Sequence, residues 1–187
     1  NDNGVLYDFA KQNPTTKVVA EFDTGEQYGF NASKSNQGVI NAVNEALAAA
    51  KKDGTYNTVY SKWFGSEPMS MPEAMSGVSA KPATVKTLTA GKIIVGSDTA
   101  FPPFENVEGG TTVGFDVDLM KAIGEKLGLQ VEFKSYKFDA LITGVQAGSE
   151  FDMVASAMTI TDERKQSIDF SDPYINSNQS LAVKKAQ

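Results

Sequence analysis

The sequence contains no cysteine and no histidine. Without cysteine it can form neither a disulfide nor a thiolate nucleophile, and without histidine it lacks the usual imidazole base and the commonest zinc ligand. A Ser-His-Asp or Cys-His catalytic centre cannot be assembled, so acid–base chemistry would fall to carboxylates, lysines or tyrosines. These absences favour a binding role that needs no cofactor and no metal.

The sequence also lacks long hydrophobic runs and clusters of positive charge. No stretch approaches the roughly 20 apolar residues of a membrane helix, and the first residues, NDNGVLYDF, show no signal peptide. The formal charge is −6 and there is no run of Lys and Arg, so we expect no nucleic-acid partner. A length of 187 residues, 41% of them hydrophobic, suits one well-packed domain and is short for two.

Strand-like and helix-like segments alternate in the second half of the chain. Strands are expected at residues 91–97, 129–136, 151–156 and 179–185, and helices with an apolar face at residues 115–129 and 138–149. Strands that alternate with crossover helices form a parallel sheet with helices on both faces. We therefore predict an α/β fold with a mainly parallel sheet.

The first 65 residues contain elements of the same kinds, and a segment of different composition follows them. We expect helices at 5–13, 35–52 and 55–65, and strands at 17–22 and 28–33. Residues 66–89 are rich in Ser, Pro, Ala and Thr with little periodicity, and they are predicted to form a linker. A flexible linker of this length spans roughly 25 to 30 Å, enough to join two domains or to cross one.

The stretch ASAMTITDERKQSIDFSDPY, residues 155–174, contains the single arginine of the chain, Arg164. Thr161, Asp162 and Glu163 predict a helix start, with a side-chain acceptor and negative charge where free N–H groups need them. A guanidinium beside a helix N-terminus favours an anion such as a carboxylate. A purely structural interpretation stays open, in which Thr161 caps the helix and Arg164 balances Asp162, Glu163 or Asp169.

Three segments carry a resemblance to one family. TITDERKQSIDFSDPY resembles the signature of the two-lobed, periplasmic-type solute-binding proteins that deliver polar amino acids to ABC importers. DGTYNTVYSKWFG resembles the usual end of that family and GKIIVGSDTAFPPFE its usual beginning. The resemblance implies a periplasmic binding protein-like fold, an extracytoplasmic location, an amino-acid ligand with glutamine foremost, and the membrane subunits of an ABC importer as partners.

The family's segments stand here in a changed order. By resemblance, residues 1–27 are a remnant of lobe 2, residues 28–65 the C-terminal part of lobe 1, residues 66–89 a linker and residues 90–187 the N-terminal part of lobe 1. The first half of lobe 2 is not found. Three explanations remain open: an engineered circular permutant trimmed in lobe 2, the junction of two tandem binding domains, or one part of an assembly completed by a second chain or a domain-swapped dimer.

The resemblance also implies the residues that contact an amino acid. Arg164 and Thr159 would take the α-carboxylate, and the carbonyl of Ala157, where the family often has glycine, would accept from the ammonium group. Asp2 matches an aspartate of lobe 2 that pairs with the ammonium, and its structural alternative is a helix cap or a frayed terminus. Asp116 is interpreted as structural, serving a helix N-terminus.

The ligand side chain would lie between two aromatic walls. Phe101 and Phe138 match those walls by resemblance, and the alternative for each is an ordinary core position. Asp98 follows the first strand of lobe 1, where ligands bind an open α/β sheet, and matches a position that contacts the distal polar group in binders of glutamine and basic amino acids. Its alternative is a solvated turn aspartate.

Three functions compete. The first is a polar amino-acid binding module, not an enzyme, whose isolated affinity is expected to be weak because much of lobe 2 is missing. The second is a scaffold, engineered or domain-swapped, that binds no ligand. The third is a dehydratase-like enzyme on the same fold, which the missing histidine disfavours.

Overall fold

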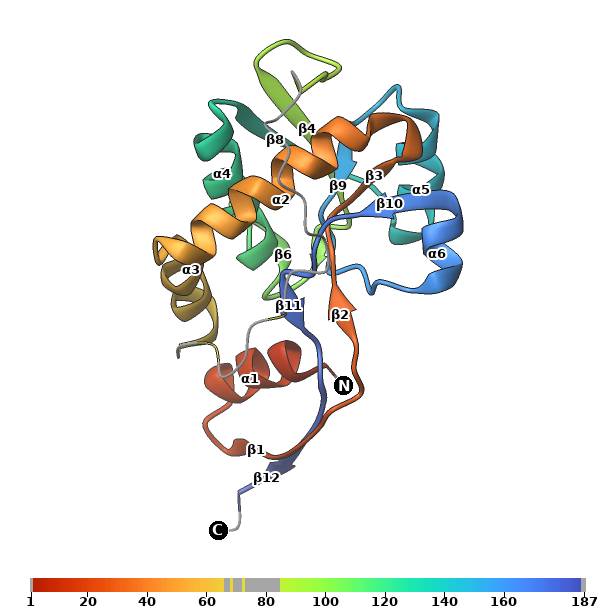
Figure 1. Ribbon diagram of the computed structural model, residues 1–187. Helices are drawn as coiled ribbons and strands as arrows, with labels where there is room; N and C mark the ends of the chain where they lie inside the picture. Colours follow the sequence, from red (N-terminus) through yellow and green to blue (C-terminus); the bar gives the residue numbers. More distant parts are fainter. Residues whose placement is uncertain (1, 66–67, 69–71, 73–84, 186–187) are drawn as a thin grey trace.

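The computed structural model describes residues 2–65, 68, 72 and 85–185 (Figure 1). Its helices are α1 (Asn3–Gln12), η1 (Lys34–Asn36), α2 (Gln37–Lys52), α3 (Thr55–Phe64), α4 (Phe115–Leu127), α5 (Phe138–Ala147) and α6 (Asp162–Ser167). Its longer strands are β1 (Thr16–Phe22), β4 (Lys92–Ser97), β6 (Glu105–Glu108), β8 (Gln130–Ser135) and β12 (Gln179–Lys184). The shorter strands are β2 (Gln27–Tyr28), β3 (Asn31–Ser33), β5 (Ala100–Phe101), β7 (Thr111–Val113), β9 (Met153–Val154), β10 (Ile168–Phe170) and β11 (Ile175–Asn176).

A five-stranded sheet with the order β10-β3-β9-β4-β8 forms the centre of the protein. Strand β4 pairs in parallel with β8 and β9, as a β-α-β order requires. Strand β3 joins β9 and β10 in antiparallel pairing. The predicted α/β class is thus confirmed, but the sheet is mixed and only its β8-β4-β9 part is parallel.

Helices cover both faces of this sheet because its strands alternate their apolar side chains. Ile93 and Val95 of β4 belong to a core cluster with α2, α3 and α4, whereas Ile94 belongs to a second cluster with α5. Helix α2 presents Val39, Ile40, Val43 and Leu47 to the first cluster at helical spacing. β4 and β9 are therefore buried on both sides, whereas the edge strand β8 has several exposed residues.

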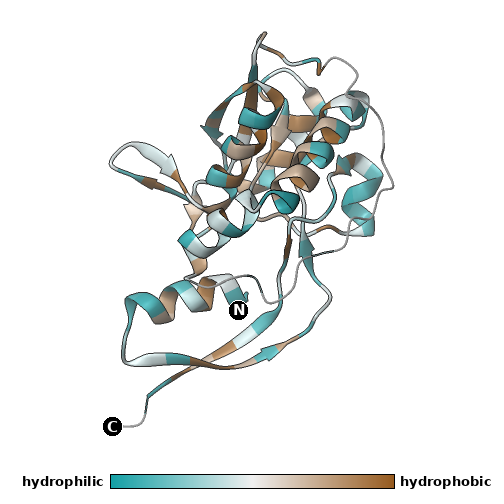
Figure 2. Cartoon of the chain, turned by 60° about the vertical axis from the view of Figure 1, so that its left-hand side comes forward, coloured by the Kyte–Doolittle hydropathy of each residue, from teal (hydrophilic) through white to brown (hydrophobic). Residues whose placement is uncertain are grey.

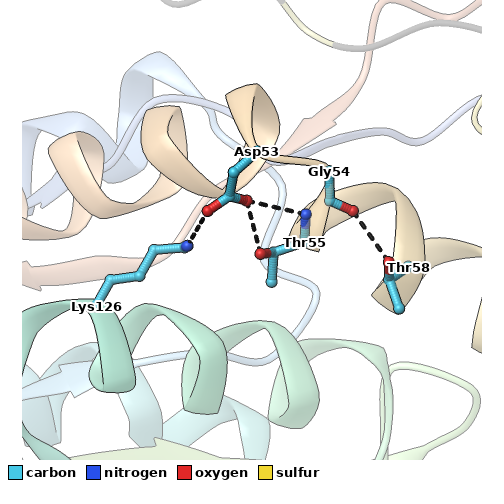
Figure 3. Close-up of polar contacts among 5 residues, drawn as sticks. All are labelled: Asp53, Gly54, Thr55, Thr58 and Lys126. Atoms are coloured by element: carbon cyan, nitrogen blue, oxygen red, sulfur yellow. Dashed lines mark hydrogen bonds and ion pairs between the residues drawn. The ribbon is translucent and has the colours of Figure 1, made fainter.

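A short polar junction fixes the angle between α2 and α3 (Figure 3). Gly54 has φ +85°, the left-handed conformation that glycine adopts without the penalty of a Cβ. The Asp53 carboxylate accepts from the N–H and the hydroxyl of Thr55 at 3.0 and 2.6 Å, and it also pairs with Lys126 of α4. The hydrogen bond from Lys126 holds the pKa of Asp53 below its ordinary value. The junction thus ties α2, α3 and α4 together.

A smaller unit of α1, β1 and β12 lies apart from the central sheet and holds both chain ends (Figure 1). β1 and β12 pair antiparallel, with an irregularity between Val18 and Ala20, and α1 packs against both strands. Hydrophobic segments of this ribbon lie at the surface (Figure 2), where Phe22 is 56% exposed and Leu181 50% exposed. α1, β1 and β12 were each expected from the sequence, whereas the pairing of β1 with β12 was not.

Residues from both sides of the undescribed interval build the same sheet. β3 lies between β9 and β10, and α2 packs against α4, all within one chain. The predicted linker 66–89 falls mostly outside the described residues. Its described residues 68, 72 and 85–88 form no helix or strand, and Thr89 forms an isolated antiparallel β-bridge with Lys92. Within the described part of the chain, no helix is long and apolar enough to cross a membrane.

Candidate functional site

The carboxyl ends of β4 and β9 lie side by side, because the two strands are parallel and Gly96 pairs with Val154. The chain continues from β9 into residues 155–161 and from β4 into Asp98. Asp98 N–H donates to Ser156 Oγ at 3.0 Å, which joins the two segments. Ligands of open α/β sheets bind at this end of the strands, and Asp98 and residues 155–161 lie there.

Arg164 lies in the first turn of α6. Its backbone N–H donates to Thr161 Oγ1 at 3.2 Å, so Thr161 caps the helix as expected. Its guanidinium Nη1 donates to the carbonyl of Thr159 at 2.8 Å, and Cζ lies 5.6 Å from the ring centroid of Phe138. The side chain therefore turns back from the short helix toward residues 157–159.

The structural interpretation of Arg164 as a surface ion-pair partner is wrong. Asp162 pairs with Lys165 at 3.5 Å, and Asp169 pairs with Lys34 at 3.5 Å. None of the salt bridges between described residues includes Arg164. The guanidinium thus keeps its charge and several N–H donors for another acceptor.

Asp98 positions one of the predicted aromatic walls. Its Oδ2 accepts from the backbone N–H of Phe138 at 3.1 Å, at the first residue of α5. This bond satisfies a free N–H of the helix start, and the charge suits the helix dipole. The alternative of a solvated turn aspartate is therefore wrong, because Asp98 is half-buried and bonded through both its N–H and its carboxylate.

The two phenylalanines lie at the margins of different core clusters, each of them partly buried. Phe101 of β5 stacks on Phe104 with 5.8 Å between ring centroids. Phe138 packs against the second cluster, beneath the Arg164 guanidinium. Neither is a fully buried core residue: each ring packs partly against a core cluster and is partly exposed, so an ordinary core position describes it only in part.

Asp2 is held by side chains from two other elements. The Tyr28 hydroxyl donates to its carboxylate, and Gln179 Nε2 donates to Oδ1 at 2.5 Å. Asp2 is the N-cap residue of α1 and its carbonyl accepts from Leu6 N–H at 3.2 Å, but its side chain makes no cap bond, so the cap alternative holds for the backbone and not for the carboxylate. Tyr28 also pairs with Thr159 in an isolated antiparallel bridge, which brings Asp2 close to the segment that carries Thr159.

Ala157 has φ +42°, a left-handed conformation that side chains with a Cβ disfavour. Its N–H donates to Asp116 Oδ2 at 2.9 Å, and it is 8% exposed. A non-glycine residue persists in this region when its surroundings hold it there, and such positions concentrate at binding sites. The occurrence of glycine here in the resembling family agrees with this φ value.

Asp116 and Glu105 lie beneath this segment and are completely buried. Asp116 is in the first turn of α4, but its Oδ2 serves Ala157 and the Tyr174 hydroxyl, the latter at 2.7 Å. The expected service to its own helix start is therefore wrong, although the structural interpretation of Asp116 holds. Burial raises the pKa of Asp116 to about 7, against the opposing hydrogen bond from Ala157.

Sequence reasoning missed Glu105 and Ser156. Ser156 Oγ donates to Glu105 Oε1 at 3.0 Å and is 2% exposed. Ser156 directly precedes Ala157 in the motif, so its position was available, whereas no local pattern distinguishes the buried Glu105 from the exposed Glu108 of the same strand. The described residues contain no group of three or more carboxylates that could hold a metal ion.

Comparison with known proteins identifies relatives over most of the chain. Residues 5–66 and 93–187 match the family described as bacterial extracellular solute-binding proteins, family 3. The arginine-binding extracellular protein ArtP of Bacillus subtilis (strain 168) is 43% identical over 94 residues, which cover 50% of this chain and 36% of that protein. A probable histidine-binding protein of Neisseria gonorrhoeae is 38% identical over 130 residues, covering 67% of this chain and 48% of that protein.

The solved structures named here match about half of the chain. An ancestral arginine-binding protein bound to glutamine is 50% identical, with 46% of this chain and 39% of that chain covered and a TM-score of 0.45. The arginine-bound form of domain 1 from TmArgBP is 41% identical, with 51% and 81% covered and a TM-score of 0.44. The chain thus spans less than half the length of the two curated relatives named above.

Proposed function

Because this chain belongs to the bacterial extracellular solute-binding proteins, family 3, we propose that it is a binding module for a polar amino acid at the carboxyl ends of β4 and β9. The observation that carries the proposal is Arg164. It is half-buried, oriented by Thr159 and Phe138, and outside every salt bridge between described residues. A planar guanidinium held in this way suits the α-carboxylate of an amino acid.

The other candidate residues complete an amino-acid receptor. Thr159 and the Ala157 carbonyl supply polar groups beside Arg164, and Asp2 supplies a negative charge for the ammonium group. Phe101 and Phe138 offer partly buried rings for the aliphatic part of the side chain. Their ligand contacts are part of the proposal.

The ligand's side chain is proposed to be neutral and polar or cationic. The motif resemblance favours glutamine, and the relatives named for arginine and histidine support a cationic side chain. The Asp98 carboxylate suits either an amide N–H or a guanidinium, and it disfavours an acidic ligand. We therefore place arginine beside glutamine as a candidate.

The chain is further proposed to be one lobe of a two-lobed protein with a remnant of the second, working outside the cytoplasm with an ABC importer. In this scheme residues 28–65 and 90–187 form lobe 1, which agrees with the insertion of β3 between β9 and β10. Residues 1–27 belong to lobe 2, which agrees with the unit of α1, β1 and β12 outside the central sheet. β12 is the exception to the scheme, because residues 179–184 fall in the range assigned to lobe 1 but pair with β1. A ligand held by one lobe and a remnant would bind weakly, because each lost charge-assisted bond costs about 1.5 to 3 kcal/mol.

The proposal is tested by an NMR titration of the labelled chain with arginine, glutamine, histidine and glutamate. Arginine or glutamine should shift the amide signals of residues 157–164 with a dissociation constant in the micromolar to millimolar range. Arg164→Ala should weaken binding roughly 10- to 150-fold, the equivalent of about 1.5 to 3 kcal/mol.

Two further variants test whether binding needs the planar guanidinium group of Arg164 or only a positive charge on α6. Lys165→Ala removes the neighbouring positive charge of α6, which is bound to Asp162 at 3.5 Å, and should leave the affinity unchanged. Arg164→Lys keeps the charge but loses the bidentate geometry, so it should resemble Arg164→Ala more than the wild type. Equal affinities of the Arg164→Ala variant and the wild type would contradict the assignment.

A further inference from the structure

The dipeptide Ser156–Ala157 rests on two carboxyl groups from different elements. Ser156 Oγ donates to Glu105 of β6 at 3.0 Å, and Ala157 N–H donates to Asp116 of α4 at 2.9 Å. Asp98 N–H donates in turn to Ser156 Oγ at 3.0 Å. We call Glu105 and Asp116 the buried acid pair. Through these bonds the pair supports both segments that carry candidate ligand residues.

Each member of the pair has one oxygen left over. Glu105 Oε2 and Asp116 Oδ1 are inaccessible to solvent, and no N–H or hydroxyl of the described residues donates to either. The two carboxyl groups are close enough that each influences the pKa of the other. None of the salt bridges between described residues supplies a cation to them. Two ionised carboxylates in this position would repel strongly, whereas one shared proton satisfies both oxygens.

We propose that the buried acid pair shares one proton at neutral pH, between Glu105 Oε2 and Asp116 Oδ1, and that this proton holds Ser156–Ala157 in the geometry that receives an amino acid. The statement that this proton prepares Ser156–Ala157 for an amino acid rests on the proposed function. Glu105 and Asp116 are positioning residues, since they act through Ser156 and Ala157. Glu105 carries the proton, because Asp116 already accepts from Ala157 N–H and from the Tyr174 hydroxyl.

The ionisable groups that face the buried acid pair keep a fixed charge, so the proton is gained and lost by the pair itself. Tyr28, Tyr56 and Tyr174 face Asp116, and burial raises the pKa of each phenol, so they stay neutral. Asp98 faces Glu105, and its negative charge further disfavours a second ionised carboxylate. Burial raises the pKa of Glu105 well above its ordinary value, and the charge of Asp116 adds to this.

The sign of the pH dependence follows from these raised pKa values. A carboxyl group whose pKa is higher in the folded than in the unfolded chain contributes its full stability below the unfolded value, near 4.3 for glutamate. That contribution is lost as the pH rises through the folded value. Ser156–Ala157 should therefore be well ordered in mild acid and loosen in alkali.

The test follows the Ala157 amide by NMR in the complete chain, between about pH 5 and about pH 9, together with arginine affinity. In the wild type the Ala157 amide signal should titrate over this pH range. The affinity for arginine should fall about tenfold as the pH rises, if ligand binding raises the pKa of the buried acid pair by one unit. Glu105→Gln replaces the shared O–H by a permanent amide N–H donor. It should abolish the titration of Ala157 and leave the affinity independent of pH.

Several results would overturn the inference. An Ala157 amide that is insensitive to pH in the wild type, or one that titrates equally in Glu105→Gln, would exclude the shared proton. If Glu105→Gln does not fold, Ser156→Ala serves instead: the Ala157 amide should still titrate, while the Asp98 amide should lose the pH response it has in the wild type. A titrating Ala157 amide with no arginine, glutamine or histidine binding at any pH would refute the proposed function and the ligand half of the inference, yet support the shared proton.

Discussion

The Tyr174 hydroxyl offers a direct measure of what the buried network contributes to stability. Tyr174 is completely buried, its hydroxyl donates to Asp116 Oδ2 at 2.7 Å, and its ring stacks on Phe30 with 4.2 Å between centroids. Tyr174→Phe removes the hydroxyl and keeps the ring. The change therefore isolates one hydrogen bond to a buried carboxyl group from the aromatic packing around it.

The expected cost follows from the chemistry of that bond. A hydrogen bond to a charged group contributes about 1.5 to 3 kcal/mol, and Asp116 keeps its bond from Ala157 N–H, so the loss should lie within this range. For a chain of this length that corresponds to a fall in melting temperature of roughly 3 to 12 °C. Because the Tyr174 bond favours the ionised form, its removal should also raise the pKa of Asp116 further.

Urea unfolding followed by circular dichroism measures the effect, with an unchanged m-value as the sign that only stability differs. Tyr136→Phe is the matched control, since the Tyr136 hydroxyl bonds to Glu150 at the surface and its loss should change the unfolding free energy by less than about 0.5 kcal/mol. Equal stabilities of the two variants would refute the reasoning, because they would show that the bond to Asp116 contributes no more than a surface contact.

Two further substitutions test the packing that supports the site, each by thermal unfolding. Gly114→Ala should lower the free energy of unfolding by at least about 3 kcal/mol, since a Cβ at this position, where φ is +144°, would lie 2.0 Å from the Phe104 carbonyl oxygen. Gly38→Ala is the control: a Cβ there would have nothing within 4 Å, so the substitution should be neutral or stabilising. Leu47→Ala should cost about 2 to 5 kcal/mol because its side chain is 1% exposed, whereas Leu181→Ala, at 50% exposed, should cost much less, and similar values for the two would contradict the assigned core.

Strong periodicity made most long elements predictable. Each end of helices α2, α4 and α5 lies within two residues of its expected bound, and the parallel pairing of β4 with β8 follows from the β-α-β order. The expected strand 28–33 is interrupted, and its two parts pair with different partners. Periodicity reports which face of a segment is apolar, but it contains no information on pairing partners or on strand direction.

The three-stranded sheet of β5, β6 and β7 was not predicted, although a signal for part of it exists. Gly109 and Gly110 both have positive φ values between β6 and β7, and a Gly-Gly pair between two short strands is typical of a hairpin. The strands themselves are too short for their periodicity to be recognised. Their position matters for the site, because β6 carries Glu105.

The candidate site, like the fold, was predictable from the sequence only in part. Arg164, Thr159 and Ala157 stand close together in one motif, so sequence alone identified them as a group and, through Thr161, predicted the helix start beside them. The same motif supplied the family to which the chain belongs. These features are local, and local residue order is sufficient to determine them.

Only the tertiary structure decided what surrounds that motif. Glu105 and Asp116 are separated in sequence from Ser156 and Ala157, yet they meet them at hydrogen-bonding distance. Whether a carboxylate is buried, which donors reach it and whether it keeps a proton depend on the packing of distant elements around it. For that reason the sequence predicted an arginine that would bind a carboxylate, while the fold revealed the acid pair on which the neighbouring segment rests.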